Sequence, residues 1–198
     1  MALMDRAKNI VLQPKQEWPV IDAEQTSVGA LYTGYIIPLA AIGPVASLIG
    51  WSLLGMRVPF VGSIRIPIGV GLRMAFIQYA GGLVGIFVLA LIIDALAPTF
   101  GGTKNQIQAL KVAAYSATAA WLAGIFGLIP MLGILAIVGL YSLYLLYLGL
   151  PILMKSPEDK ALGYTVVVII VAIVLEVVII SITRQFYWQP SAMGMPGL

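Results

Sequence analysis

The uncharged stretch VAAYSATAAWLAGIFGLIPMLGILAIVGLYSLYLLYLGLPILM, residues Val112–Met154, decides how this chain must fold. It holds 43 residues without Asp, Glu, Lys or Arg. One helix of that length would measure about 65 Å, roughly twice the hydrocarbon core of a bilayer. The stretch must therefore form two membrane spans that fold back as a hairpin, and Gly127 and Pro130 are the natural place for its turn.

The composition of the whole chain also points to a membrane protein. Of its 198 residues 61% are hydrophobic and 10% charged, and the mean hydropathy is +1.01. A soluble domain is roughly 45–50% apolar and about 25% charged. Cysteine and histidine are absent from the sequence, which removes thiolate, iron–sulfur, histidine–metal and Ser-His-Asp chemistry. The 11 basic residues are scattered, so we expect no nucleic-acid surface, and no motif calls for a cofactor.

Three further apolar stretches flank the hairpin. Residues Val28–Met56 hold no charge and exceed the length of one span, so this helix must tilt or kink, most naturally at Pro38 or Pro44. Residues Ile68–Ala97 and Ala161–Thr183 supply the second and fifth spans. The predicted fold is an all-α integral membrane protein with five transmembrane helices.

Polar segments separate these spans. Arg57–Pro67 is too short to cross a bilayer and too apolar for open water, which favours an interfacial or re-entrant loop. Pro98–Gln108 is a polar turn, and Lys155–Lys160 is a charged one. The last span ends in Arg184–Trp188, an aromatic and basic belt typical of a membrane interface.

Residues 1–27 form the only extended polar segment and carry seven of the 19 charges. We interpret Ala2–Leu12 as a short amphipathic helix on the membrane surface, ended by Pro14, with Trp18 as an interfacial anchor. A frayed polar tail is the alternative. The apolar face of this helix comprises Leu3, Ala7, Ile10 and Val11.

The predicted organisation is an N-terminal cytoplasmic or interfacial segment over 1–27, a five-span domain over 28–188 and a disordered tail over 189–198. With the N-terminus in the cytoplasm, seven basic residues fall on the inner side and four on the outer side. This excess follows the positive-inside rule and places the C-terminus outside.

Four segments of the chain resemble the Yip (Ypt-interacting protein) domain family of five-span membrane proteins. They are IVLQPKQEW (Ile10–Trp18), GYIIPLAAIGP (Gly34–Pro44), KVAAYSATAAW (Lys111–Trp121) and YSLYLLYLGLPILMKSPEDKALGY (Tyr141–Tyr164). Together with their spacing they extend over most of the chain, and none is a catalytic signature.

The resemblance implies a role in membrane organisation rather than catalysis. Eukaryotic Yip proteins are associated with Rab GTPases, vesicle formation and membrane shaping, usually through a longer cytosolic N-terminal region. A polar segment of about 27 residues resembles the compact prokaryotic members, which implies the bacterial cytoplasmic membrane. No functional residue is carried over from the family.

Two acidic residues within the spans are candidates for an intramembrane polar site. Glu176 lies 16 residues after Lys160 and 12 before Trp188, well inside the hydrocarbon layer. A carboxyl group there needs protonation, a partner or water. It is a proton, cation or lipid site, or a structural carboxyl that fixes helix packing. Asp94 lies near the cytoplasmic edge, and a metal ion shared between Asp94 and Glu176 is an open alternative.

Two arginines near the outer interface are candidates for lipid-headgroup contacts. Arg73 begins the second span and can snorkel to lipid phosphate. Arg184 ends the fifth span within the predicted interface belt.

Small residues and tyrosines recur at helical spacing. Pairs of small residues four apart allow close helix approach, and we expect its use within one molecule, although a homodimer is possible. Tyr141, Tyr144 and Tyr147 form a stripe that favours packing over a cation or lipid track. The small pairs are Ala46 with Gly50, Gly81 with Gly85, and Ala120 with Gly124.

These observations predict a non-enzymatic membrane scaffold or adaptor that binds lipids and other membrane proteins. The alternative is a small transporter, channel or lipid-translocating protein that uses the carboxyl of Glu176. An intramembrane enzyme is the least supported class, because the chain lacks His, Cys and a paired-carboxylate motif.

Overall fold

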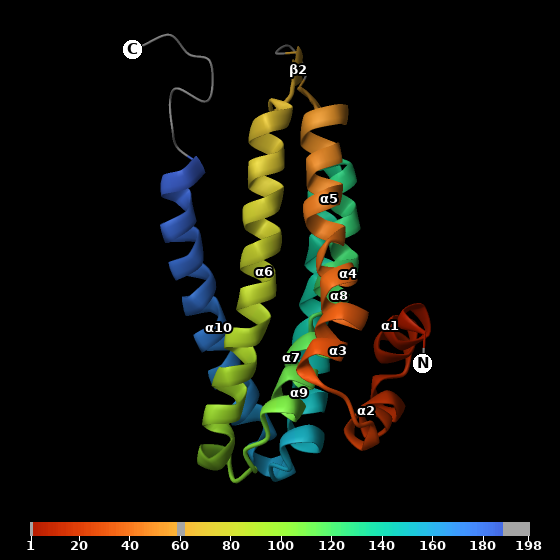
Figure 1. Ribbon diagram of the computed structural model, residues 1–198, viewed down its shortest axis with the longest axis vertical. Helices are drawn as coiled ribbons and strands as arrows, with labels where there is room; N and C mark the ends of the chain where they lie inside the picture. Colours follow the sequence, from red (N-terminus) through yellow and green to blue (C-terminus); the bar gives the residue numbers. More distant parts are fainter. Residues whose placement is uncertain (1, 59–61, 188–198) are drawn as a thin grey trace.

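The computed structural model describes residues 2–58 and 62–187 and forms an elongated helical bundle (Figure 1). Within these residues, four helical segments are long and apolar enough to cross a membrane: Val28–Leu54, Ile68–Phe100, Gln106–Leu128 and Pro130–Met154. They agree with the first four predicted spans. The long uncharged stretch is thus divided between two segments, as its length required.

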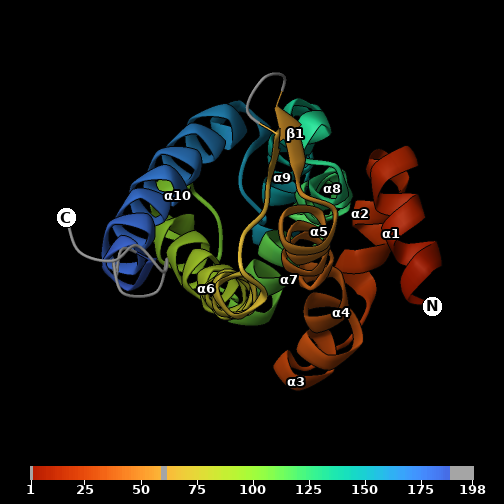
Figure 2. The same cartoon turned by 90° about the horizontal axis from the view of Figure 1, so that it is seen from above.

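Two short helices precede the first span. They are α1 (Leu3–Leu12) and α2 (Pro14–Ala23). The end of α1 before Pro14 agrees with the prediction, whereas α2 was not predicted. Both helices lie beside the bundle near one of its ends, and α1 runs across the long axis of the bundle rather than along it (Figures 1 and 2).

The first span is a helix of changing pitch. The hydroxyl of Ser27 accepts a hydrogen bond from the backbone amide of Ala30 (3.2 Å) and so caps its start. An interruption at Ala41 falls between Pro38 and Pro44, whose missing amide hydrogens weaken the helical hydrogen bonding on both sides. The predicted kink site is confirmed. The segments are α3 (Val28–Leu31), η1 (Tyr32–Ile36), α4 (Ile37–Ala40), α5 (Ile42–Leu48) and η2 (Ile49–Leu54), where η1 and η2 are π-helical.

A β-hairpin replaces part of the predicted loop between the first two spans. Strands β1 (Met56–Val58) and β2 (Gly62–Ile64) pair antiparallel, with Met56 opposite Ile64. The hairpin caps one end of the bundle, hereafter the hairpin end (Figure 1).

The second span leads from the hairpin end to the opposite end of the bundle. It consists of α6 (Ile68–Leu96), followed by the 3-10 turn η3 (Ala97–Phe100).

The predicted third-to-fourth hairpin is confirmed. The ascending limb comprises α7 (Gln106–Ser116), α8 (Thr118–Ala123) and the 3-10 segment η4 (Gly124–Leu128). Ile129 is extended and reverses the chain, and Pro130 begins the descending limb. That limb comprises the 3-10 segment η5 (Pro130–Leu140) and α9 (Tyr141–Met154).

The last helix, α10 (Glu158–Tyr187), is 30 residues long. It contacts α9, α6 and η3 at the end of the bundle opposite the hairpin and diverges from α6 towards the hairpin end (Figure 1).

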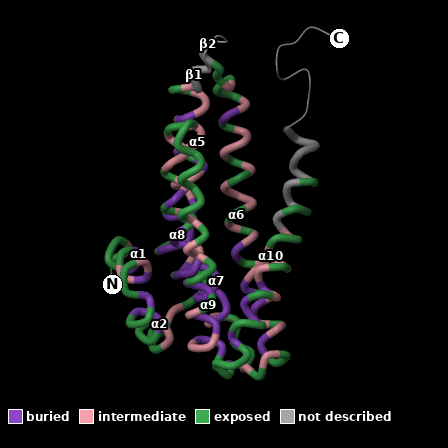
Figure 3. Tube along the Cα trace, turned by 180° about the vertical axis from the view of Figure 1, so that it is seen from behind, coloured by how far each residue is buried: buried purple, intermediate pink, exposed green. Residues whose placement is uncertain are grey.

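The buried core is displaced towards the end opposite the hairpin. Figure 3 shows the buried residues gathered around α7, α9 and the inner faces of α1 and α2, whereas residues near the hairpin end are mostly exposed or half-buried. Most of the largest fully buried side chains belong to this core, among them Trp18, Leu110, Leu145 and Tyr164.

Close helix contacts explain two of the three predicted small-residue pairs. A Cβ atom on Gly50 would lie 2.1 Å from the carbonyl oxygen of Gly127, and one on Gly124 would lie 2.8 Å from Cα of Gly43. These contacts hold the first span against the third. The expectation for Gly81 and Gly85 of α6 was wrong within the described part of the chain, because no described atom lies within 4 Å of a Cβ atom built on either residue.

Candidate functional site: the N-terminal ion cluster

A buried group of charges joins the N-terminal helices to each other and to the bundle. The side chains of Arg6 and Glu17 are both buried. Arg6 donates from Nη1 to Oε1 of Glu17 and from Nη2 to Oε1 of Glu24. Because Glu17 belongs to α2 and Glu24 follows it, one guanidinium from α1 fastens the two helices together. We name Arg6, Glu17, Glu24 and Lys111 the N-terminal ion cluster.

Lys111 of α7 connects this cluster to the bundle. Its Nζ atom donates to the backbone carbonyl oxygens of Ile21 (2.8 Å) and Glu24 (2.5 Å). These carbonyls lie at the C-terminal end of α2, where the helix leaves acceptors without intrahelical partners and presents the negative end of its dipole. The buried ammonium group therefore binds the helix by charge and by hydrogen bonding together.

Asp22 provides a second connection at the edge of the cluster. Its Oδ1 accepts a hydrogen bond from Nε2 of Gln108 (2.9 Å), and its Oδ2 forms an ion pair with Nζ of the exposed Lys155 (2.5 Å). Through these contacts α2 is bound to the start of α7 and to the end of α9.

Trp18 lies in the core, so its predicted role as an interfacial anchor was wrong. The side chain is 0% exposed and contacts Tyr115 edge to face, with ring centroids 6.4 Å apart. On its other side lies Gly149 of α9. The tryptophan is buried because α2 packs against α9, which creates an apolar site within the protein instead of at its surface.

The aromatic side chains beside the cluster extend its polar contacts into the bundle. The Arg6 guanidinium lies 5.7 Å from the centroid of the Tyr115 ring, a cation–π distance. Tyr35 packs against Tyr115, with centroids 4.6 Å apart, and its hydroxyl shares a hydrogen bond with Thr118 (2.7 Å). The first span, the third span and the N-terminal helices therefore meet at this cluster.

Of the four site residues predicted from the sequence, the structure describes the side chains of Asp94 and Arg73. Glu176 and Arg184 belong to α10, but their side chains lie outside those that the structure describes. Asp94 of α6 is half-buried, and its Oδ1 is buried with no hydrogen-bond partner in the described part of the chain. Beside it, the hydroxyl of Tyr164 donates to the carbonyl oxygen of Ile93, which ties α10 to α6.

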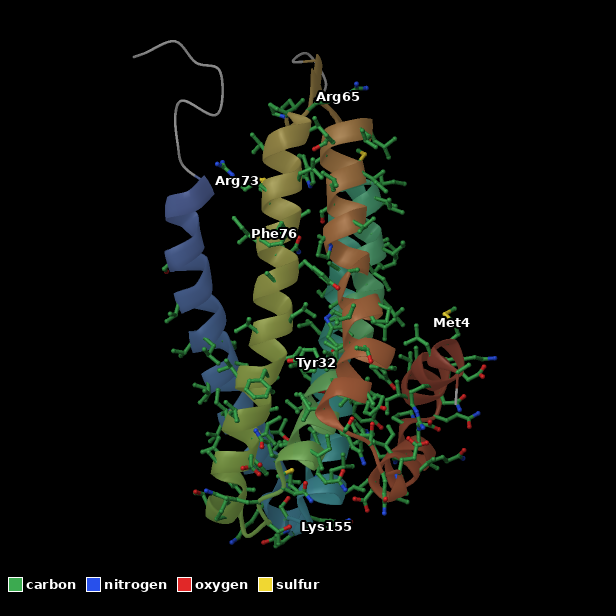
Figure 4. All side chains as sticks on the ribbon, in the orientation of Figure 1. Met4, Tyr32, Arg65, Arg73, Phe76 and Lys155 are labelled. Atoms are coloured by element: carbon green, nitrogen blue, oxygen red, sulfur yellow. The ribbon has the colours of Figure 1, made fainter. Side chains whose placement is uncertain are left out.

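Arg73 lies near the hairpin end of α6. Its Nε and Nη2 atoms are buried and have no hydrogen-bond partner among the residues that the structure describes, while the side chain as a whole is half-buried. Figure 4 shows this side chain on the side of α6 that is turned towards α10. A guanidinium keeps its charge, so these donors favour an anionic partner.

Sequence reasoning missed the N-terminal ion cluster because its residues resemble ordinary loop markers. In the sequence, Arg6, Lys111 and Lys155 differ in no visible way from the other basic residues of the predicted inner side. The one available signal was the number of acidic residues between positions 17 and 24, since Glu17, Asp22 and Glu24 precede a span that has no charge. Among the described residues, no group of three or more His, Cys, Asp or Glu side chains is placed to hold a metal ion.

Comparison with models of known protein families identifies a family for this chain. The family model described as Yip1 domain matches residues 8–179. No curated protein and no solved structure matches the chain.

Proposed function

Because the chain belongs to the Yip1 domain family, we propose that it is a non-enzymatic integral membrane scaffold or adaptor that binds lipids and other membrane proteins. We place it in the bacterial cytoplasmic membrane, with the N-terminus in the cytoplasm. In this proposal α10 is the fifth span. Its 30 residues extend about 45 Å, enough to cross a bilayer core.

The observation that carries this proposal is a small-residue face of α6 that no described side chain occupies. Gly81, Gly82 and Gly85 have open space where a side chain would begin. Elsewhere in the same molecule, small pairs are used for close contact between helices, as at Gly50 and Gly124. A face with the same spacing and no described atom in close contact with its Cβ positions suits a helix from another protein or from a second copy.

A cross-linking experiment tests the adaptor role directly, since the chain has no native cysteine. A single cysteine replaces Gly82, and native membranes are treated with a bifunctional thiol reagent. We expect a defined adduct with a second copy or with a specific membrane protein. Gly133→Cys is the matched control, because Gly133 is equally open but belongs to η5, outside the Gly81–Gly85 segment of α6. An adduct pattern identical for both variants would contradict the proposal.

The alternative is a small transporter, channel or lipid-translocating protein. It is favoured by the position of Glu176, 18 residues after the first residue of α10 and thus about 27 Å along the helix. The purified chain in proteoliposomes then carries protons, ions or lipid, and Glu176→Gln abolishes the flux. The scaffold proposal expects no flux from either form.

A further inference from the structure

The face of α1 that is turned away from the bundle carries large apolar side chains. Met4 is 74% exposed and Leu12 is 65% exposed, and the exposed Lys8 lies midway between them. Spacing of four residues places all three on one stripe of the helix. This is not the apolar face predicted from the sequence, because the bundle buries Ala7 and Ile10.

The direction of this stripe distinguishes it from an ordinary exposed face. Since α1 runs across the long axis of the bundle (Figures 1 and 2), its side chains can point along that axis. Figure 4 shows Met4 pointing towards the hairpin end and away from Lys155. Exposed apolar side chains of the spans lie in that direction, among them Met131 and Ile134 of η5, which are 83% and 80% exposed.

Tyrosines place α1 at the level of a membrane interface. The hydroxyl of Tyr141 donates to the carbonyl oxygen of Val11 (3.0 Å) and so ties the last turn of α1 to the start of α9. On the hairpin side of Tyr141 lie the 11 residues of η5, which extend about 22 Å at the rise of a 3-10 helix. On its other side follow the exposed rings of Tyr144 and Tyr147. A change from exposed apolar residues to tyrosines marks a membrane–water boundary.

We infer that α1 is a membrane-embedded interfacial helix whose stripe Met4–Lys8–Leu12 enters the lipid leaflet on its side of the bilayer. Met4 and Leu12 lie among the acyl chains, and Lys8, together with the exposed Lys15, contacts anionic headgroups. This inference rests on the proposed lipid binding and identifies the surface that performs it. The bundle holds the opposite face of α1, so the helix is fixed in depth.

Site-directed fluorescence tests the inference on the full-length chain. Single cysteines replace Met4 or Leu12 and carry an environment-sensitive dye, and Gln16→Cys on the exposed side of α2 is the matched control. Each variant is reconstituted in vesicles of phosphatidylglycerol and phosphatidylcholine in equal parts. We expect lipid-borne spin labels to quench the dyes at positions 4 and 12 at least about twofold more than the dye at position 16, as for residues below the headgroups. Iodide in the aqueous phase should quench the dye at position 16 more than the dyes at positions 4 and 12.

A second arm tests the charge contribution. With the dye at position 12, the Lys8→Gln/Lys15→Gln variant should lose quenching in the mixed vesicles and behave like the parent in pure phosphatidylcholine. Equal iodide quenching at positions 4, 12 and 16 overturns the inference, and insensitivity to the lysine changes overturns its headgroup part. Because the Gly82 cross-linking does not depend on α1, failure here is distinguishable from failure of the scaffold proposal.

Discussion

Trp18 occupies the space that a side chain at residue 149 would need: a Cβ atom on Gly149 would lie 2.6 Å from Cζ2 of the indole. Gly149→Ala should therefore displace α2 from α9 and lower the free energy of unfolding by about 1–3 kcal/mol, as expected for overpacking in a core. Hydrogen exchange should become faster in Pro14–Ala23. Gly82→Ala is the control, because nothing lies within 4 Å of that site, and it should be neutral or stabilising by up to about 1 kcal/mol. Equal effects of the two variants would argue against the contact.

The Arg6–Glu17 pair should behave as a buried ion pair. Arg6→Met leaves the carboxylate of Glu17 buried without its cation, and we expect a loss of about 3–5 kcal/mol in the free energy of unfolding. The double variant Arg6→Met/Glu17→Leu should lose less free energy of unfolding, because two apolar side chains leave no buried charge without a partner. Lys155→Met breaks only an exposed ion pair with Asp22 and should change stability by less than about 1 kcal/mol. Denaturation of all variants in one detergent measures these differences. A double variant with a lower free energy of unfolding than Arg6→Met would contradict the prediction.

Lys111 should determine whether the N-terminal helices stay docked. Lys111→Met removes both hydrogen bonds to the end of α2, and hydrogen bonds from charged groups contribute about 1.5–3 kcal/mol each. We expect faster hydrogen exchange throughout α1 and α2, with little change in α6. The exposed Lys104 provides the control Lys104→Met, which should leave the exchange of both helices unchanged. Unchanged protection of α2 from hydrogen exchange in Lys111→Met would contradict the prediction, because the remaining contacts would then suffice to keep the helix docked.

Arg73 should bind a phospholipid through the guanidinium nitrogens that have no partner among the described residues. Arg73→Gln should reduce phospholipid retention in native mass spectrometry, while retention of phosphate-free diacylglycerol is unchanged. In lipid-free detergent the same variant should be more stable by about 1–2 kcal/mol, because it removes buried unpaired donors. Arg65→Gln is the matched control, since Arg65 is exposed near the same end. Loss of stability in both conditions would indicate a structural role instead.

Hydropathy and helix geometry predicted the transmembrane part of the fold well. The uncharged stretch had to form a hairpin, because no single helix of that length fits a bilayer. Its turn falls at Gly127–Pro130, where the sequence predicted it. The glycine pairs show the limit of this reasoning. Gly124 and Gly85 look alike in sequence, but only Gly124 faces another small residue, Gly43, and that depends on which helices become neighbours.

The N-terminal ion cluster lay beyond sequence reasoning for a related reason. A tryptophan before a span is typical of an interface anchor, and only the docking of α2 on α9 makes Trp18 a core residue. Likewise, Lys111 follows a polar turn and resembles an interface lysine, yet its partners are the backbone carbonyls of Ile21 and Glu24. Periodicity describes one helix at a time and contains no information on such distant pairs.

The position of these contacts in the sequence affects the order in which the protein can be completed. The N-terminal helices leave the ribosome first, but Val11 and Asp22 contact residues 130 and 133 positions later, at Tyr141 and Lys155. Until the fourth span is in place, the indole of Trp18 lacks its packing partner at Gly149, and such late, distant contacts are slow to form. Docking of α1 and α2 therefore indicates that the later helices have been inserted. In a truncated or misassembled chain α1 and α2 would stay undocked and exposed to proteases during biosynthesis.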